Sequence, residues 1–109
     1  MKKIAYIISG RSSNELLEEN LFAPLQKDEL QTKASILFFV ADGVYHLMKG
    51  SRSSKSLRTI MERDKSKIFG CEISIKNRKL QNVIIEGVIL GNLNDFYNAA
   101  KDEDHIISF

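Results

Sequence analysis

Three residue types are scarce in this sequence: its 109 residues include one cysteine, one proline and no tryptophan. A single cysteine cannot form a disulfide within the chain, so we expect a protein of a reducing compartment, the cytoplasm. Long apolar segments are missing as well. The longest largely apolar run, Ala34–Ala41, covers less than half of the ~20 residues that a helix needs to cross a bilayer. We therefore expect no association with a membrane.

The first residues imitate a signal peptide, because two lysines precede a mostly apolar run. That run ends at Ser9-Gly10-Arg11, and no small-residue cleavage pattern follows it. We interpret the run as the first buried strand of the fold.

Charge and metal-binding residues are also limited. Sixteen Lys and Arg against 14 Asp and Glu leave a formal net charge of +2, which is too small to indicate nucleic acid without a patterned basic face. One cysteine and two histidines far apart in the chain do not form a metal-ligand set. The sequence therefore predicts no nucleic-acid partner, no metal and no other cofactor.

Apolar runs alternate with helical periodicity along the chain, which is typical of an α/β domain with a mostly parallel sheet. We predict one domain over residues 1–109 with about five strands. The predicted strands are Lys3–Ser9, Ala34–Val40, Ile68–Cys71, Val83–Leu90 and His105–Phe109.

Helical segments are predicted between these strands. The first is capped by Ser12 or Ser13 and is interrupted near Pro24, and the last is capped by Asn92 with Asp95 in the position of a capping-box acid. The segment Lys49–Ser56 contains four serines, one glycine and three basic residues. We predict that it is a mobile loop over Cys71, with the next helix carrying its apolar stripe from Leu57 onward. Further helical turns are expected at 44–48 and 72–79.

The candidate site lies where several strands end. In an open parallel sheet, ligands bind beyond the carboxyl ends of the strands, because helix N-termini and loop amides converge there. Cys71 is the candidate catalytic residue at this edge. The candidate pocket residues around it are Ser9, Asp42, Gly43, Tyr45, His46 and Asn92.

Alternative interpretations apply to these residues. A helix that begins after Cys71 would favour its thiolate, but Glu72 is negative, and a free cysteine at a strand end is often a packed apolar residue. His46 is able to supply a proton or pair with a thiolate, although a partly exposed histidine bonded to its own loop is the favoured interpretation. The segment Ser9–Asn14 is placed where flavodoxin-like proteins cradle a phosphate, and helix capping explains its serines equally well.

Three segments resemble the DsrE/TusD-like (DsrE/DsrF-like) family of small sulfur-transfer proteins. Ile36–Tyr45 (ILFFVADGVY) resembles a family strand that is followed by an acid, Gly-Val and an aromatic residue. Cys71–Leu80 (CEISIKNRKL) resembles the segment where the sulfur-carrying cysteine opens a short helix that ends in a basic pair. Gly91–Phe109 is similar to the closing turn, helix and strand of the family.

The resemblance implies a three-layer α/β/α sandwich of the Rossmann-like or flavodoxin-like kind. It also implies assembly into trimers or hexamers, or into a hetero-oligomer with related subunits. Leu47, Met48 and Phe109 are apolar residues that one small sheet would not cover, which agrees with assembly. The implied activity is sulfur relay, in which Cys71 holds a persulfide and passes it between donor and acceptor proteins, as a sulfurtransferase does.

Two other classes of function stay open. One is a structural or interaction subunit of the same fold, which a buried Cys71 would favour. The other is a flavodoxin-like binder of a phosphate or nucleotide through Ser9–Asn14.

Overall fold

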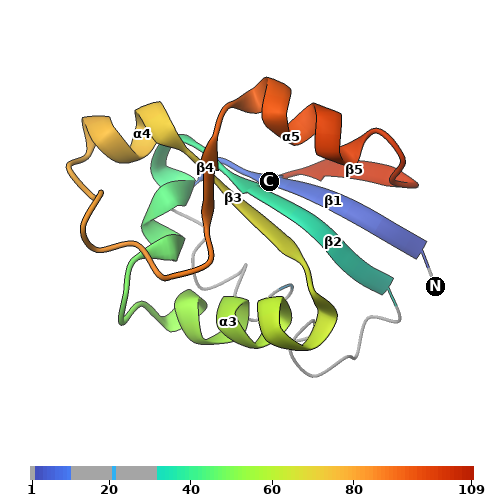
Figure 1. Ribbon diagram of the computed structural model, residues 1–109, viewed down its shortest axis with the longest axis horizontal. Coiled ribbons are helices and arrows are strands. Elements are labelled where there is room, and N and C mark those ends of the chain that lie inside the picture. The colour runs from blue at the N-terminus through green and yellow to red at the C-terminus, as the bar shows by residue number, and fades with distance from the viewer. Residues whose placement is uncertain (1, 11–20, 22–31) are drawn as a thin grey trace.

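A sheet of five parallel strands forms the centre of the protein (Figure 1). The computed structural model describes residues 2–10, 21 and 32–109. The strand order across the sheet is β4-β3-β2-β1-β5, which confirms the predicted α/β class. The strands are β1 (Lys2–Ile8), β2 (Thr32–Phe39), β3 (Lys67–Cys71), β4 (Ile89–Gly91) and β5 (His105–Ser108).

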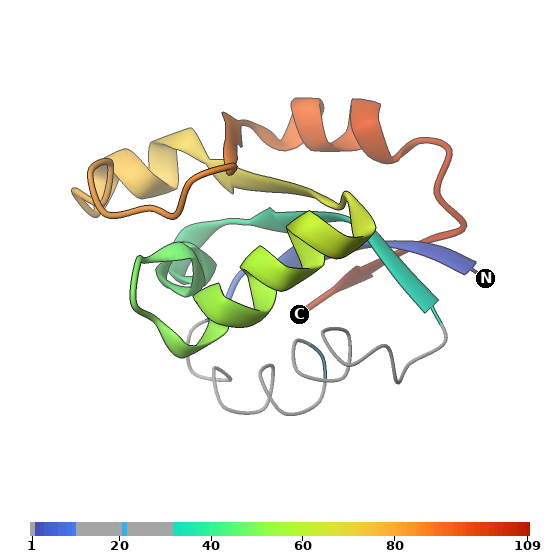
Figure 2. The same cartoon turned by 60° about the horizontal axis from the view of Figure 1, so that its bottom comes forward.

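Helices lie on both sides of this sheet. Within the described residues they are the 3-10 helix η2 (Ala41–Leu47) and the α-helices α3 (Arg52–Asp64), α4 (Glu72–Asn77) and α5 (Leu93–Ala100). Figure 2 shows α3 on one side of the sheet and α5 on the other, so the architecture has three layers. The predicted first helix, with its cap at Ser12 or Ser13 and its break near Pro24, falls outside the described residues except Leu21.

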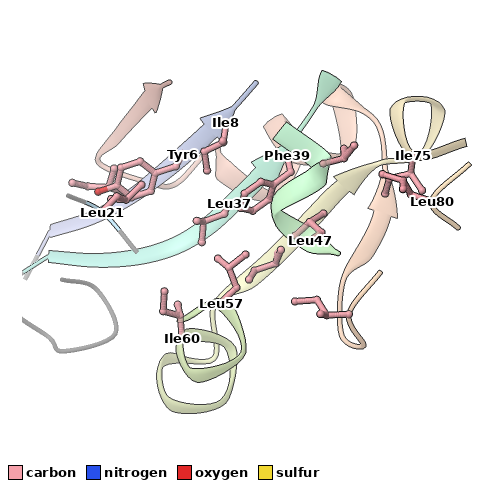
Figure 3. Close-up of a cluster of buried hydrophobic side chains, with 14 residues drawn as sticks. Tyr6, Ile8, Leu21, Leu37, Phe39, Leu47, Leu57, Ile60, Ile75 and Leu80 are labelled. Atoms are coloured by element: carbon pink, nitrogen blue, oxygen red, sulfur yellow. The ribbon is translucent and has the colours of Figure 1, made fainter. Parts of the chain in front are cut away.

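Each face of the sheet carries its own apolar cluster. Alternate residues of β2 divide between them: Leu37 and Phe39 join the cluster on the α3 side (Figure 3), while Ile36 and Phe38 join the cluster on the α5 side. The ring of Phe38 stacks on Phe96 of α5 with a centroid distance of 5.4 Å. An apolar strand without alternation, as predicted here, is what burial on both faces requires. Each fully buried side chain of this size contributes about 1.5–3 kcal/mol.

Most of the serine-rich segment is helical, so the predicted loop over residues 49–56 is wrong for residues 52–56, while residues 49–51 lie outside a helix as predicted. Helix α3 begins at Arg52, and its first turns bury Ser53, Ser54 and Ser56. The backbone N–H of Ser54 donates to Oγ of the N-cap residue Ser51 at 3.1 Å. Serine is small enough to pack here and its hydroxyl finds partners: Ser53 Oγ lies 2.9 Å from His46 Nδ1 of η2, and Ser54 Oγ donates to the Ser51 carbonyl at 2.7 Å. Composition alone therefore misjudged this segment.

The fourth strand is shorter than predicted. Only Ile89–Gly91 pairs with β3, whereas Val83–Leu90 was expected to be a strand. The backbone of the earlier residues bonds to the end of η2 and the residues after it: Ile85 N–H donates to the carbonyl of Leu47 at 2.9 Å, and Val83 accepts from Lys49 N–H at 2.7 Å. The chain then turns at Gly87, whose φ of +95° favours glycine.

Within the part of the chain that the structure describes, no helix is both long and apolar enough to cross a membrane.

Candidate functional site

Cys71 sits at a corner between a strand and a helix. It is the last residue of β3 and the N-cap residue of α4. The corner is tight, because a Cβ added to Gly70 would lie 2.8 Å from Cδ1 of Ile75 and 3.1 Å from Cδ1 of Leu47. The Cys71 side chain is half-buried and packs against the cluster on the α5 side. Its position at the carboxyl end of β3 is the one predicted from the sequence.

A cavity opens beside Cys71 between two neighbouring strands. Helix α4, which follows β3, adds Ile75 to the cluster on the α3 side, whereas α5, which follows β4, adds Phe96 to the opposite cluster. Connections that leave adjacent strands toward different faces create a crevice at the carboxyl edge. Here it has a volume of about 380 Å³. The residues that line it are Cys71, Glu72, Ile73, Lys76, Leu90, Gly91, Asn92 and Asp95.

The far wall of this cavity is fixed by the start of α5. Asn92 Oδ1 accepts from Asp95 N–H at 3.0 Å, and Asp95 Oδ2 accepts from Asn92 N–H at 2.8 Å. This is the capping box predicted from the sequence. A Cβ on Gly91 would lie 2.7 Å from Asp95 Oδ2, so the carboxylate sits directly against the Gly91 backbone. Asn92 is thus a predicted pocket residue that does line the cavity with Cys71.

Asp42, predicted as a pocket residue, pairs with Arg78 and is not among the described residues that line the cavity beside Cys71. Arg78 Nε and Nη2 donate to Asp42 Oδ1 at 3.1 and 2.9 Å. Nearby, Ala41 N–H donates to Ser74 Oγ at 3.0 Å, so η2 bonds to one side chain of α4 and to the side chain of the α4 C-cap residue, Arg78. An exposed ion pair of this kind is worth about 1 kcal/mol or less. Asp42 therefore helps to position the helix that follows Cys71.

His46 is buried, not partly exposed as predicted. Its side chain is 2 % exposed, and Nδ1 lies 2.9 Å from Ser53 Oγ on α3. The imidazole ring is also 5.9 Å from the ring of Phe39. Burial lowers the pKa of His46 from its ordinary value of 6.5, and a hydrogen bond with the Gly10 backbone partly offsets that effect.

This burial predicts a loss of stability in mild acid. The unfolded chain takes up a proton on this side chain near pH 6.5, whereas the folded chain takes it up only at lower pH. The free energy of unfolding should therefore fall as the pH drops below about 6.5, and it should be independent of His46 above that pH. Urea unfolding from pH 7.5 to 5 measures this slope.

Two variants separate the contribution of His46 from that of the carboxylates. His46→Gln should remove part of the slope between pH 6.5 and 5, whatever its effect on absolute stability. His105→Gln is the matched control, because His105 is the other histidine and is exposed. Equal slopes in wild type and His46→Gln would contradict the prediction.

The remaining predicted residues lie close to the ends of β1 and β2. Gly43 is buried, and its N–H donates to the carbonyls of Ser9 and Val40. Tyr45 is half-buried against the cluster on the α3 side. Ser9 Oγ donates to the carbonyl of Phe109 at 2.9 Å. Of the proposed phosphate segment Ser9–Asn14, residues 11–14 fall outside the described residues.

Sequence reasoning did not predict several lining residues. Ile73 and Leu90 are apolar yet 68 % and 51 % exposed, and Lys76 is exposed one turn into α4. For Ile73 and Leu90, the sequence pattern that could have indicated them is an apolar residue within two positions of the end of a short strand. Arg78 could be named from the basic pair, but its partner could not, since Asp42 lies 36 positions earlier.

A larger cavity lies elsewhere in the molecule, between α3 and the turn at Gly87. Its volume is about 720 Å³, and the side chains lining it are mostly exposed groups of both charge signs. Among the described residues that line it there is no thiol and no buried polar group, so size alone does not make it the better candidate. The lining residues are Lys49, Arg58, Met61, Glu62, Glu86 and Gly87.

The fold and site define an open parallel α/β protein with a cysteine at the carboxyl edge of its sheet. A model of the DsrE/DsrF-like family matches residues 2–109, so the chain belongs to this family. No curated protein matches the chain.

Solved structures show the same fold. The ychN protein of E. coli is 20% identical, with a TM-score of 0.71 over 100% of both chains. A conserved protein of unknown function from Bacteroides thetaiotaomicron is 12% identical, with a TM-score of 0.73 over 97% of this chain and 94% of that one. A protein of unknown function from Methanobacterium thermoautotrophicum is 15% identical, with a TM-score of 0.66 over 97% of each chain. At these identities, the likeness establishes the fold.

Proposed function

We propose that this protein carries sulfur as a persulfide on Cys71 and passes it from a donor protein to an acceptor protein in the cytoplasm. The observation that carries the proposal is the placement of Cys71. It is the only cysteine of a DsrE/DsrF-like chain, it is only half-buried, and it lines a cavity at the carboxyl edge of the sheet. A purely structural cysteine would be expected inside the core, out of reach of a second thiol.

The proposed transfer has two displacement steps. The Cys71 thiolate attacks the outer sulfur of the donor persulfide, the sulfur–sulfur bond of the donor breaks, and the donor thiolate leaves with the electron pair. An acceptor thiolate then attacks the outer sulfur on Cys71, and the Cys71 thiolate is released. No oxidant or reductant is consumed, because one sulfur–sulfur bond forms for each one that breaks.

Neighbouring residues would support these steps by position. As the N-cap residue, Cys71 lies beside the first N–H groups of α4, which have no partner within that helix. Asp42 and Arg78 fix α4 against η2. Asn92 and Asp95 hold the opposite wall. Tyr45 and His46 would contribute indirectly, by keeping η2 packed in place.

Mass spectrometry tests the proposal directly. The protein is incubated with a sulfane-sulfur donor, and the intact mass should rise by one sulfur atom, with peptide mapping to Cys71. A thiol reductant should reverse the gain. If Cys71 reacts with iodoacetamide in the native state but no donor adds sulfur to it, the relay is refuted and a structural or interaction subunit becomes the better assignment.

Both edges of the sheet expose apolar side chains, which supports assembly. In β4, Ile89 and Leu90 are exposed, and in β5, Ile106 and Ile107 are exposed. Phe109 was expected to remain uncovered by the sheet, and it is 47 % exposed. Leu47 was expected to remain uncovered as well, but this prediction is wrong because Leu47 is fully buried. Uncovered edge strands are sites where chains associate. We propose a homo-oligomer, a trimer or hexamer, or a hetero-oligomer with related subunits.

Light scattering at micromolar concentration measures the assembly. We expect a mass that is a multiple of the 12.4 kDa of one chain. Replacing Ile89 and Ile107 with Asp should lower that mass, because a buried charge without a partner opposes association. A wild-type mass of a single chain would refute the oligomer.

A further inference from the structure

The cavity beside Cys71 contains more negative than positive charge. Among the described residues that line it, Glu72 and Asp95 are acidic and Lys76 is the one basic residue. Asp95 is held in place, because its carboxylate accepts from Asn92 N–H at 2.8 Å. Glu72 follows Cys71 directly in the chain, is exposed, and lines the same cavity as the thiol.

Apolar side chains make up much of the rest of the opening. Ile73 is 68 % exposed and Leu90 is 51 % exposed, and both line the cavity. An incoming group therefore meets apolar surface together with excess negative charge. This combination favours an apolar donor that is neutral or positive near its sulfur and disfavours a small anion.

We propose that Glu72 is a specificity-determining residue that excludes anionic sulfur donors from Cys71. The donor would then be a persulfide on a neutral or basic, partly apolar group, such as a segment of a protein chain, and not a small anion such as thiosulfate. The inference rests on the proposed sulfur transfer. The step with thiosulfate would be the same displacement, in which the outer sulfur bonds to Cys71 and sulfite leaves with the electron pair.

Two alkylating reagents with the same leaving group test the charge effect without sulfur transfer. Iodoacetamide is neutral and iodoacetate is an anion. The rate constant of each reagent with Cys71 is measured at low salt. The rate constant for iodoacetamide is divided by that for iodoacetate, and the quotient is then divided by the same quotient for a neutral model thiol. This ratio is independent of how much thiolate is present, because both reagents attack the same thiolate.

The decisive variant is Glu72→Gln, with Glu86→Gln as the matched control. Glu86 is an exposed glutamate that lines the other cavity. We expect the ratio to fall about fivefold in Glu72→Gln and to stay at the wild-type value in Glu86→Gln. The difference should shrink near 1 M salt, where the Debye length is only about 3 Å. Equal ratios in wild type and Glu72→Gln, or equal falls in both variants, would overturn the proposal.

Loading with thiosulfate separates this inference from the proposed function. Glu72→Gln should accept sulfur from thiosulfate several times faster than wild type does, with Glu86→Gln unchanged. If the alkylation ratio changes as expected but no donor loads either protein, the charge selection stands and the sulfur relay fails. If both proteins load equally fast from thiosulfate, the relay stands and the role of Glu72 is refuted.

Discussion

Replacing Cys71 with serine should abolish sulfur loading and leave the fold intact. The serine hydroxyl cannot form a persulfide, so no mass gain is expected with any donor. Stability should change by about 1 kcal/mol or less, because serine is among the best residues at the start of a helix and Cys71 is only half-buried. Intact-mass measurement reports the loading, and urea unfolding reports the stability.

A second substitution makes this result specific to the sulfur atom. Cys71→Ala removes the polar group as well, and it should also fail to load while unfolding in a single transition. Loading that persists in Cys71→Ser would contradict the assignment of the site. If both Cys71→Ser and Cys71→Ala unfold or dissociate, Cys71 is a packing residue and its role as the sulfur carrier is refuted.

Replacing Gly43 with alanine should destabilise the protein strongly, by about 3 kcal/mol or more. A Cβ at this position would lie 2.1 Å from the carbonyl oxygen of Ile8 and 2.8 Å from its carbonyl carbon. These are backbone atoms at the end of β1, where Val40 N–H also donates to the Ile8 carbonyl at 3.0 Å. Relief of the clash would require β1 and η2 to separate. Thermal and urea unfolding measure the loss.

Gly50→Ala is the control for Gly43→Ala. Gly50 has a φ of +82°, and a Cβ there meets nothing within 4 Å. Its replacement should cost only the backbone strain of a left-handed residue, about 1–2 kcal/mol. Similar losses for the two variants would show that η2 moves away from β1 at little cost.

Local features of the site could be predicted from the sequence. The capping box of Asn92 and Asp95 spans three positions, and its hydrogen bonds depend only on the residues themselves and the start of a helix. The continuous apolar run of β2 predicts a strand buried on both faces, because a strand buried on only one face would alternate. The same kind of local pattern predicts that Cys71 ends a strand and that a helix begins directly after it.

Features that depend on distant segments could not be predicted in this way. The composition around the buried serines of α3 is typical of a loop, and only the packing of η2 against them shows why they are helical and buried. His46 looks exposed until Ser53 and the Phe39 ring surround it. Sequence composition reports how polar a residue is, but it does not report which neighbour satisfies its hydrogen bonds.

The sequence by itself determined the parallel α/β class, the carboxyl-edge position of Cys71, the cap at Asn92 and the resemblance to the DsrE/DsrF-like family. Each of these depends on periodicity or on residues a few positions apart. Only the tertiary structure decided what surrounds the thiol. Pairing of Cys71 with Gly91 brings Leu90 and Asp95 to the cavity, and the bond from Arg78 ties Asp42 to α4. These contacts join segments that meet only when the strands pair, so no local pattern encodes them.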